Sequence, residues 1–217
     1  MKNIKTVNVL VDNDSWVLPY AEQLVTACKK MGLDVTFARN QHELVQSDVS
    51  FFIGCTQLVS PENLKKSALN LVVHESALPE GKGFAPVAWQ ILEGKQDIPI
   101  CLIEASEAAD SGDIWLQDSF SLSGNELYHE WRAKQGQATL ALCIKFLNDS
   151  QSITPIKQHG VESFYARRTP RDSELSIEKT LEQQFDLLRT VDNDNFPAFF
   201  HHRGKTYKLE ISEYDVE

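Results

Sequence analysis

Apolar segments of strand length alternate with segments of helical periodicity along the first 150 residues of this 217-residue chain. The strand-like segments are almost continuously apolar and rich in β-branched residues, as is typical of strands buried on both faces of a parallel sheet. The alternation predicts an α/β fold of Rossmann-like type, in which helices cover both faces of a mostly parallel sheet. We expect strands at 5–13, 33–39, 48–55, 69–73 and 98–105, helices at 20–31, 60–68, 84–94 and 124–149, a short helical piece at 41–46, and an extended segment before residue 122.

The composition changes near residue 150, which divides the chain into a sheet domain, 1–150, and an appendage, 151–217. The appendage begins as a basic, loop-like stretch at 159–176. A helix is predicted over 177–191, and a β-hairpin over 196–211.

The hairpin turns at Arg203–Gly204, which suits a tight two-residue turn. Its first strand, Pro197–Phe200, is more apolar than an isolated hairpin needs, and such a hairpin is only marginally stable in water. We therefore expect the appendage to mediate a homodimer. His201 and His202 are expected to be exposed.

The net charge of −10 argues against nucleic acid as a main partner, because phosphate binding needs a basic face. The four cysteines are scattered without a Cys-x-x-Cys pair, so they predict no metal site and no disulfide framework, only small buried side chains. The chain shows no cleavable signal, and no apolar run approaches the ~20 residues of a membrane span. We expect a reduced, cytoplasmic protein that does not bind membranes.

Two predicted loops carry candidate catalytic residues. His74 follows the strand at 69–73, and Asp110 lies in the loop after the strand at 98–105. Because ligands of parallel sheets bind beyond the carboxyl ends of the strands, we expect both loops to leave that edge and to pair a general base with an orienting carboxylate. From the residues alone, His74 could equally be a strand-end histidine, and Asp110 a turn residue before Gly112.

A combination of motifs resembles the folate-dependent formyltransferases. The chain has HESALP at 74–79, then Gly83 and Pro86, then DSGDI at 110–114. The family carries Asn-x-His-x-Ser-Leu-Leu-Pro, Arg-Gly-x-x-Pro and Asp-x-Gly-x-Ile, with a matching spacing from histidine to aspartate. The resemblance covers about residues 50–117. It implies the formyltransferase fold and transfer of a formyl group from N10-formyltetrahydrofolate, as co-substrate, to a primary amine.

The resemblance also implies roles for particular residues. His74 would take the amine proton or donate a hydrogen bond to the developing oxyanion, and Asp110 would hold the tautomer of the imidazole. The segment FFIGCTQLVSP, 51–61, is similar to the strand and loop that line the family's folate pocket. The cofactor-binding residues that it implies are Cys55, Leu58, Ala105, Glu107 and Asp110.

The chain departs from the family at Val72, where the family has an asparagine that donates to the formyl oxygen. Asn70 is on the same strand face, but about 6.6 Å further back. The oxyanion donor is therefore His74 alone, a residue of another loop, or absent. In the last case the protein would be a non-catalytic homologue that binds folate or a sugar nucleotide.

The appendage resembles one branch of the family. Residues 165–172 and 187–209 are similar to the linker and C-terminal start of formyltransferases that act on nucleotide-linked amino sugars, which implies such a sugar as the substrate. The tRNA-directed branch shares this stretch but has a further domain, and we expect this chain to be too short and too acidic for it. The glycinamide-ribonucleotide branch fits the length but lacks the Arg-Arg-Thr-Pro and Phe-Pro-Ala-Phe-Phe elements, and it stays an alternative.

Several residues are candidates for contact with this substrate. Arg167 and Arg168 could clamp a diphosphate in bidentate fashion. Phe164 and Tyr165 could stack on a pyrimidine base. The full set that the resemblance implies is Ser76, Lys82, Gly83, Phe164, Tyr165, Arg167 and Arg168.

For three further side chains the residues leave alternatives open. Lys82 would meet a phosphate or be solvated. Trp89 is expected to pack in the core from its helix, and Trp115 is either a core residue or a substrate contact.

Overall fold

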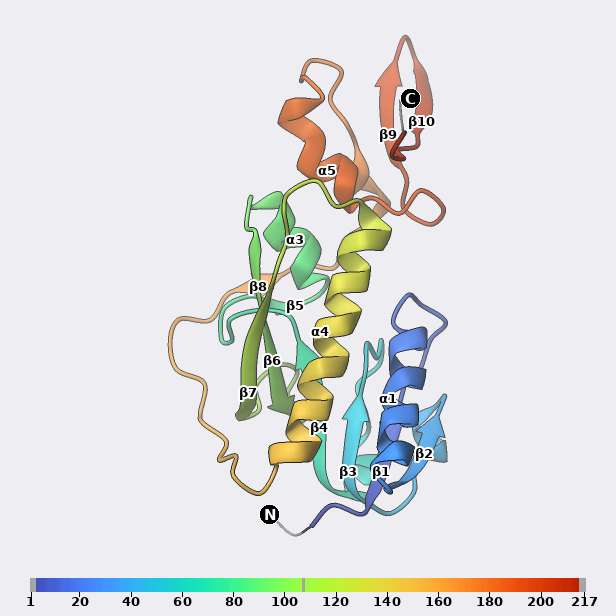
Figure 1. Cartoon of the computed structure of the whole chain (residues 1–217). Coiled ribbons are helices and arrows are strands. Elements are labelled where there is room, and N and C mark those ends of the chain that lie inside the picture. Colours follow the sequence, from blue (N-terminus) through green and yellow to red (C-terminus); the bar gives the residue numbers. More distant parts are fainter. Residues whose placement is uncertain (1–2, 107, 215–217) are drawn as a thin grey trace.

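The computed structural model describes residues 3–106 and 108–214, and its centre is a six-stranded sheet (Figure 1). The strands are β1 (Thr6–Leu10), β2 (Asp34–Ala38), β3 (Ser47–Phe52), β4 (Ser67–His74), β6 (Asp97–Glu104) and β7 (Ile114–Ser121), in the order β2-β1-β3-β4-β6-β7. The first four run parallel, β6 runs antiparallel to β4, and β7 antiparallel to β6. The predicted α/β fold with a mostly parallel sheet is confirmed.

Two long helices cover the first face of the sheet. The helices α1 (Leu18–Lys30) and α4 (Tyr128–Asp149) lie side by side across it (Figure 1). Odd-numbered strand residues such as Val9, Phe51 and Leu71 point toward them and are fully buried, since alternate residues of a strand share a face. The short helix α3 (Pro86–Leu92) closes a separate apolar cluster against the far end of β6 and β7.

The second face of the sheet is more thinly covered. Its even-numbered residues, among them Leu10, Phe52 and Val72, pack against the 3₁₀ turn η1 (Gln41–Glu43) and the short helix α2 (Pro61–Leu64). The connections from β2 to β3 and from β3 to β4 are too short to hold a long helix. His74 shares this face with Val72, two residues before it on β4. His74 therefore lies on the face of the sheet that the two long helices do not cover.

A pair of two-residue strands that the sequence did not predict joins the linker to the sheet domain. β5 (Lys82–Gly83) pairs in parallel with β8 (Phe164–Tyr165). Among the described residues, no helix is long and apolar enough to cross a bilayer.

The helix predicted over 177–191 is wrong in its first part. Only the 3₁₀ turns η2 (Pro170–Ser173) and η3 (Glu182–Gln184) and the helix α5 (Phe185–Thr190) form in this region. The side chain of Gln184 accepts from the backbone N–H of Ser176 and donates to the carbonyls of Ser176, Lys179 and Thr180. These hydrogen bonds satisfy the backbone in a non-helical path, which overrides the helical periodicity.

The appendage ends in the expected hairpin of β9 (Ala198–His202) and β10 (Lys205–Leu209). Arg203 and Gly204 both have positive φ, 47° and 77°, which suits a tight hairpin turn. His201 and His202 are exposed, as predicted. Apolar residues of the hairpin pack within the same chain against a small cluster formed by Leu175, Leu188, Val191 and Ala198. The hairpin thus has a partner surface of its own, and the homodimer stays a prediction.

A buried carboxylate joins the start of α4 to its surroundings. Glu126 is 6% exposed and accepts from Lys134 Nζ at 2.5 Å and from the backbone N–H of Ser123 and Gly124. Burial alone would raise the pKa of Glu126, but these hydrogen bonds outweigh it and lower the pKa to about 2. A lowered pKa contributes stability that is present above the unfolded value of 4.5 and is lost as the pH falls toward 2.

We therefore expect Glu126→Gln to destabilise the protein at pH 7 by up to about 3 kcal/mol, the free energy equivalent of that pKa difference. The loss should shrink steadily between pH 4.5 and pH 2. Urea unfolding of both proteins across this range measures it, with Glu22→Gln on the exposed face of α1 as the control. A loss that does not change with pH would contradict the assignment of this stability to ionised Glu126.

Candidate active site

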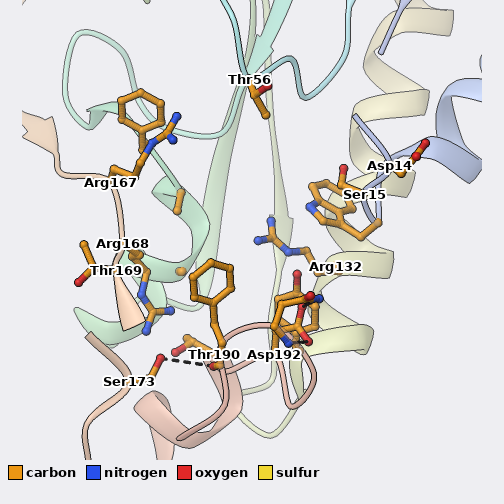
Figure 2. A pocket seen from close by; sticks show the side chains of 17 residues that line it. Asp14, Ser15, Thr56, Arg132, Arg167, Arg168, Thr169, Ser173, Thr190 and Asp192 are labelled. Carbon is orange, nitrogen blue, oxygen red and sulfur yellow. Dashed lines mark hydrogen bonds between the residues drawn. The ribbon is translucent and has the colours of Figure 1, made fainter. Parts of the chain in front are cut away.

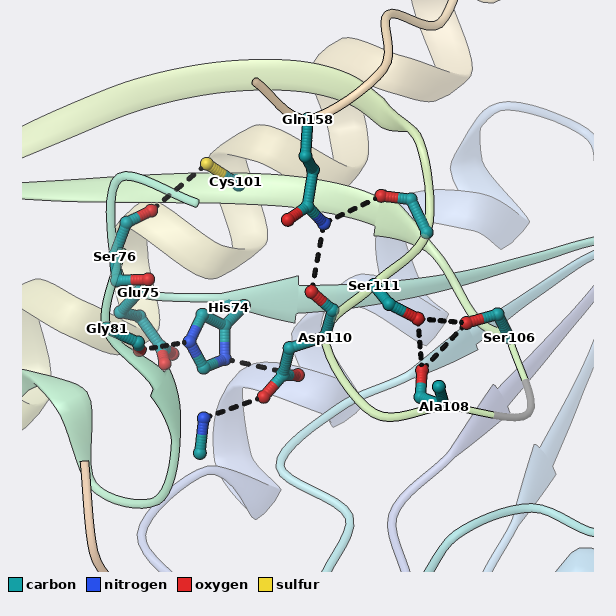
Figure 3. Close-up of polar contacts among 12 residues, drawn as sticks. His74, Glu75, Ser76, Gly81, Cys101, Ser106, Ala108, Asp110, Ser111 and Gln158 are labelled. Atoms are coloured by element: carbon teal, nitrogen blue, oxygen red, sulfur yellow. Dashed lines mark hydrogen bonds and ion pairs between the residues drawn. The ribbon is translucent and has the colours of Figure 1, made fainter. Parts of the chain in front are cut away.

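His74 ends β4, Asp110 lies in the loop between β6 and β7, and their side chains meet (Figure 3). The Nδ1 atom of His74 lies 3.5 Å from Oδ1 of Asp110, and His74 is 5% exposed. Its Nε2 atom donates to the carbonyl oxygen of Gly81 at 2.8 Å, and the N–H of Gly83 donates to Oδ2 of Asp110 at 2.8 Å. The structure thus brings together the two residues that the sequence predicted as catalytic, and their roles stay a prediction.

The path by which Asp110 reaches His74 differs from the expected one. β6 runs antiparallel to β4, with Glu104 opposite Leu71 and Cys101 opposite His74. The carboxyl ends of antiparallel strands point to opposite edges of a sheet. The loop after β6 therefore starts beside the middle of β4 and turns back toward His74. The expectation that both loops leave the same edge is wrong, although the pair forms.

The return of this loop depends on close backbone packing at Gly112. A Cβ atom at this position would lie 1.7 Å from the carbonyl oxygen of Glu104, so a larger residue would force the two strands apart. Asp110 has a φ of 51°, in the left-handed region that non-glycine residues rarely adopt. The Asp-Ser-Gly-Asp-Ile motif therefore encodes a loop shape as well as a carboxylate.

The hydrogen bond to Gly81 defines how the His74 ring is presented. A carbonyl oxygen can only accept, so Nε2 of His74 carries a proton, and Nδ1 faces the carboxylate of Asp110. The carboxylate fixes the orientation of the ring. The Nε2–H group is then the donor available to any ligand oxygen that displaces the Gly81 carbonyl.

Val72 stands between two apolar clusters, one with Phe52 and one with Cys101. The neighbouring polar candidate, Asn70, is occupied elsewhere, since its side-chain N–H donates to the carbonyl of Leu64 at 2.9 Å. The Asn70 amide is therefore turned to the backbone of α2, and His74 stays the predicted donor on this strand.

The residues implied in folate binding lie partly around Val72. Cys55 and Ala105 are half-buried members of the same apolar cluster as Val72, and burial raises the pKa of the Cys55 thiol to about 12, so it stays protonated. Leu58 is 67% exposed. Glu107 lies outside the described residues.

A cavity of about 630 Å³ opens between the sheet domain and the appendage (Figure 2). Residues that follow β1 and β3 line one wall, which places the cavity beyond the carboxyl ends of these parallel strands. Arg167 and Arg168 of the linker lie on one side of it, and Arg132 of α4 lies on the other. Aromatic side chains line it as well: Trp16, Phe84, Tyr128 and Phe196.

Arg132 is the most enclosed of the three arginines. Its guanidinium lies 4.6, 5.1 and 4.2 Å from the ring centres of Trp16, Tyr128 and Trp131. It donates to Gln135, and its Nε atom is buried without a hydrogen-bond partner among the described residues. Burial lowers the pKa of Arg132, yet an arginine keeps its charge. The cavity thus presents a cation whose hydrogen-bonding capacity is only partly used.

The other two arginines, Arg167 and Arg168, also line the cavity, and their role in binding a ligand stays a prediction. Arg167 stacks on the ring of Phe84 at 4.5 Å. Arg168 donates to the carbonyl of Asp172, and its Nε atom is likewise unpartnered among the described residues. Burial lowers the pKa of Arg168, the nearby charge of Asp172 opposes this, and the charge of Arg132 adds to the lowering. Asp14 and Asp192 also line the cavity, so its arginines lie among carboxylates as well as beside one another.

The remaining predicted substrate residues do not line this cavity. Phe164 is 70% exposed on β8. Tyr165 stacks on Trp89 and donates to Glu93 at 2.8 Å. Lys82 is 5% exposed and pairs with a carboxylate, so the solvated alternative is wrong.

Ser76 and Gly83 support the histidine loop. Ser76 is buried and donates to the carbonyl of Glu80, while Gly83 acts through its N–H on Asp110.

The two tryptophans have separate roles. Trp115 packs in the core against Phe146, which decides between its two alternatives. The core prediction for Trp89 is wrong, because Trp89 is half-buried, stacks on Tyr165 and donates through its indole N–H to Ala166 of the linker.

Sequence reasoning missed Arg132, Trp16, Phe84 and Phe196. Arg132 lies on a long amphipathic helix, where a lone arginine usually signals a solvated face. The only local signal is Tyr128, which lies four residues earlier on the same helix face.

A protein-family model described as formyl transferase matches residues 22–142, more than half of the chain. Among curated proteins, the methionyl-tRNA formyltransferase of Wolbachia sp. subsp. Drosophila simulans (strain wRi) is 26% identical over 149 residues. The match covers 67% of this chain and 49% of that protein. The chain thus spans about half the length of the curated relatives it matches.

Solved structures share the fold. A methionyl-tRNA formyltransferase from Clostridium thermocellum matches with a TM-score of 0.81 at 20% identity, covering 98% of this chain and 94% of that chain. A 4-N formyltransferase from Francisella tularensis matches with a TM-score of 0.76 at 17% identity over 99% and 100%. HypX from Aquifex aeolicus, in complex with tetrahydrofolic acid, matches with 0.75 at 16% identity over 97% and 38%.

Proposed function

Because this chain belongs to the formyl transferase family, we propose that it transfers a formyl group from N10-formyltetrahydrofolate to the primary amine of a nucleotide-linked amino sugar. The observation that carries the proposal is the three-arginine cavity. Phe84 lines this cavity, and the backbone N–H of the preceding residue, Gly83, donates to Asp110. A ligand in the cavity would thus reach toward the His74–Asp110 pair.

The chemistry of the cavity suits a nucleoside diphosphate. Three guanidinium groups can form bidentate hydrogen bonds to adjacent phosphates, and arginine is well shaped for this contact. Exposed Phe84 and Phe196 offer apolar faces on which a planar base can stack. The volume of about 630 Å³ is in the usual range for a small-molecule site.

We assign the folate co-substrate, which supplies the formyl carbon, to the apolar surface of Cys55, Val72 and Ala105 beside His74. The amine nitrogen would attack that carbon, and negative charge would develop on the formyl oxygen. The intermediate would then collapse with cleavage of the bond between the carbon and N10, and tetrahydrofolate would leave with a proton on N10. The Nε2–H of His74, which donates to Gly81 in this structure, would turn to the formyl oxygen. A donor of this kind contributes roughly 3 kcal/mol to transition-state stabilisation.

We assign the acceptance of the amine proton to Asp110. Its carboxylate faces Nδ1 of His74 at 3.5 Å and would accept the proton that the amine loses. His74 can act as the base itself only if Nε2 first loses its proton and its bond to Gly81. The donor role of His74 needs the smaller rearrangement.

A second candidate is transfer to methionyl-tRNA, because the curated relatives carry that name. The net charge of −10 disfavours it, since a long-range field of this sign repels a polyanion. Glycinamide ribonucleotide, which carries one phosphate, stays a further alternative, as does a non-catalytic binding protein.

One assay separates these functions. The purified protein is incubated with N10-formyltetrahydrofolate and, in parallel, with nucleotide-linked amino sugars, glycinamide ribonucleotide or methionyl-tRNA, and each acceptor is analysed by mass spectrometry. We expect one added formyl group on an amino sugar and none on the same nucleotide sugar with a hydroxyl in place of the amine. Formylation of another acceptor, or of none, would overturn the proposal.

A further inference from the structure

The linker between α4 and β8 returns along the β7 edge of the sheet and reaches both loops of the catalytic pair (Figure 1). We call its residues Ile156–Tyr165 the strap. Ile156 pairs with Ile114, the first residue of β7, through two backbone hydrogen bonds of 2.8 and 2.9 Å. The next residue, Lys157, forms an ion pair with Asp113 at 2.8 Å. The strap is thus attached to the end of the Asp110 loop.

Gln158 of the strap contacts the Asp110 loop itself. Its Nε2 group donates to the carbonyl of Asp110 at 2.9 Å and to the carbonyl of Gly112 at 2.8 Å (Figure 3). One carboxamide thereby bridges the carbonyl groups of Asp110 and Gly112. These bonds hold Asp110 in the strained left-handed conformation that aims its carboxylate at His74.

The strap also holds the histidine loop. The N–H of Gly81 donates to Oγ of Ser163 at 2.8 Å, and the N–H of Lys82 donates to the carbonyl of Ser163 at 2.9 Å. The Lys82 ammonium pairs with Glu162 at 2.6 Å. Gly81 in turn supplies the carbonyl that receives His74 Nε2–H. The backbone groups that orient both members of the pair are therefore anchored on one short segment.

We propose that the strap positions the catalytic pair and that Gln158 is the positioning residue for Asp110. The inference rests on the proposed function only in taking the pair as catalytic. Without the Gln158 carboxamide, Asp110 can relax toward the preferred right-handed backbone region, which swings its carboxylate away from His74. The arrangement of the pair is then a property of residues beyond 150 as well as of the sheet domain.

The test compares Gln158→Ala with Gln151→Ala, which removes an exposed glutamine of the same linker. The first readout is the ring signals of His74 in nitrogen-15 NMR of the full-length protein, assigned through the spectrum of His74→Gln. We expect Gln158→Ala to shift the His74 signals, while the signals of the histidines far from the substitution, His42, His129, His201 and His202, stay unchanged. Gln151→Ala should shift none. Unchanged His74 signals in folded Gln158→Ala would overturn the proposal.

The second readout is formyl transfer. Gln158→Ala is expected to lower kcat about 10- to 100-fold with KM for the acceptor within about twofold, because small misplacements of catalytic groups cost rate more than binding. If Gln158→Ala does not fold, Gln158→Asn replaces it, since this substitution shortens the side chain by only one methylene. It should lower kcat and shift the His74 signals in the same way. An unchanged kcat with unchanged His74 signals would overturn the role of Gln158.

The two readouts separate the two proposals. Shifted His74 signals in a protein that formylates no acceptor would support the strap and overturn the proposed function. Unshifted His74 signals with normal formyl transfer would overturn the role of the strap and support the proposed function. A role confined to stability would lower the melting temperature and leave both the His74 signals and kcat unchanged.

Discussion

Replacing Asp110 with asparagine is expected to lower kcat/KM for formyl transfer by about 10³-fold or more, with a nearly unchanged melting temperature. The substitution keeps the shape of the side chain, and the amide oxygen can still accept from Gly83. It removes the charge that faces Nδ1 of His74 at 3.5 Å and the acceptor for the amine proton. A loss of rate without a loss of stability is the signature of a catalytic carboxylate.

His74→Asn should have a similar effect for a different reason. The asparagine side chain is too short to present a donor where Nε2–H lies, so the oxyanion loses its hydrogen bond on β4, where Val72 provides none. The control is Asp118→Asn, an exposed aspartate of β7 that contacts neither the His74–Asp110 pair nor the strap. Its rate should stay within a few-fold of the wild type.

Steady-state kinetics with thermal unfolding of each variant measure these effects. The non-catalytic alternative makes the opposite prediction, namely that His74→Ala and Asp110→Asn change no property of the protein except its stability. Substantial turnover by either variant would show that the pair is structural.

The second large effect is expected at Arg132, where substitution by methionine should weaken binding of a nucleoside diphosphate about 10- to 100-fold. The guanidinium is held among three aromatic rings and aimed at a cavity that holds two more cations. A charge-assisted hydrogen bond of this kind is worth about 1.5–3 kcal/mol. Methionine fills the aromatic cage without the charge, so the fold should be retained.

Calorimetric titration with free UDP, TDP and GDP measures binding separately from catalysis. Arg132→Lys should recover only part of the affinity, because an ammonium cannot form a bidentate contact. The control is Arg171→Met, an exposed arginine of the appendage that does not line the cavity. Equal affinities of the wild type and Arg132→Met for every nucleotide would remove the cavity from the substrate site.

The sequence predicted the elements whose signals are local. Strands such as β3 and β4 are apolar runs with turn residues at their ends, and the hairpin turn at Arg203–Gly204 follows from residues in direct succession. The helix over 177–191 failed because its periodicity is also local, whereas the decisive contact is the side chain of Gln184, which binds the backbone of three earlier residues.

The candidate site, too, was predicted where its signals are local and missed where they are not. Motifs around His74 and Asp110 identified the pair, yet the assumed geometry of parallel strand ends was wrong, because β6 enters the sheet in the opposite direction. The direction of a strand depends on how the chain crosses the sheet. A run of apolar residues is equally compatible with a parallel and an antiparallel strand, so the sequence does not determine the direction. Arg132 was missed because its surroundings come from the loop before α1 and from the appendage.

By itself, then, the sequence determined the α/β architecture, the two catalytic candidates and the arginine pair of the linker, since each rests on neighbouring residues or a motif. Only the tertiary structure decided that Gln158 holds Asp110, that Ser163 holds Gly81 and that Arg132 joins Arg167 and Arg168 in one cavity. These contacts join residues far apart in the chain, and their energies exist only once the sheet has brought the segments together. No local pattern of residues records them.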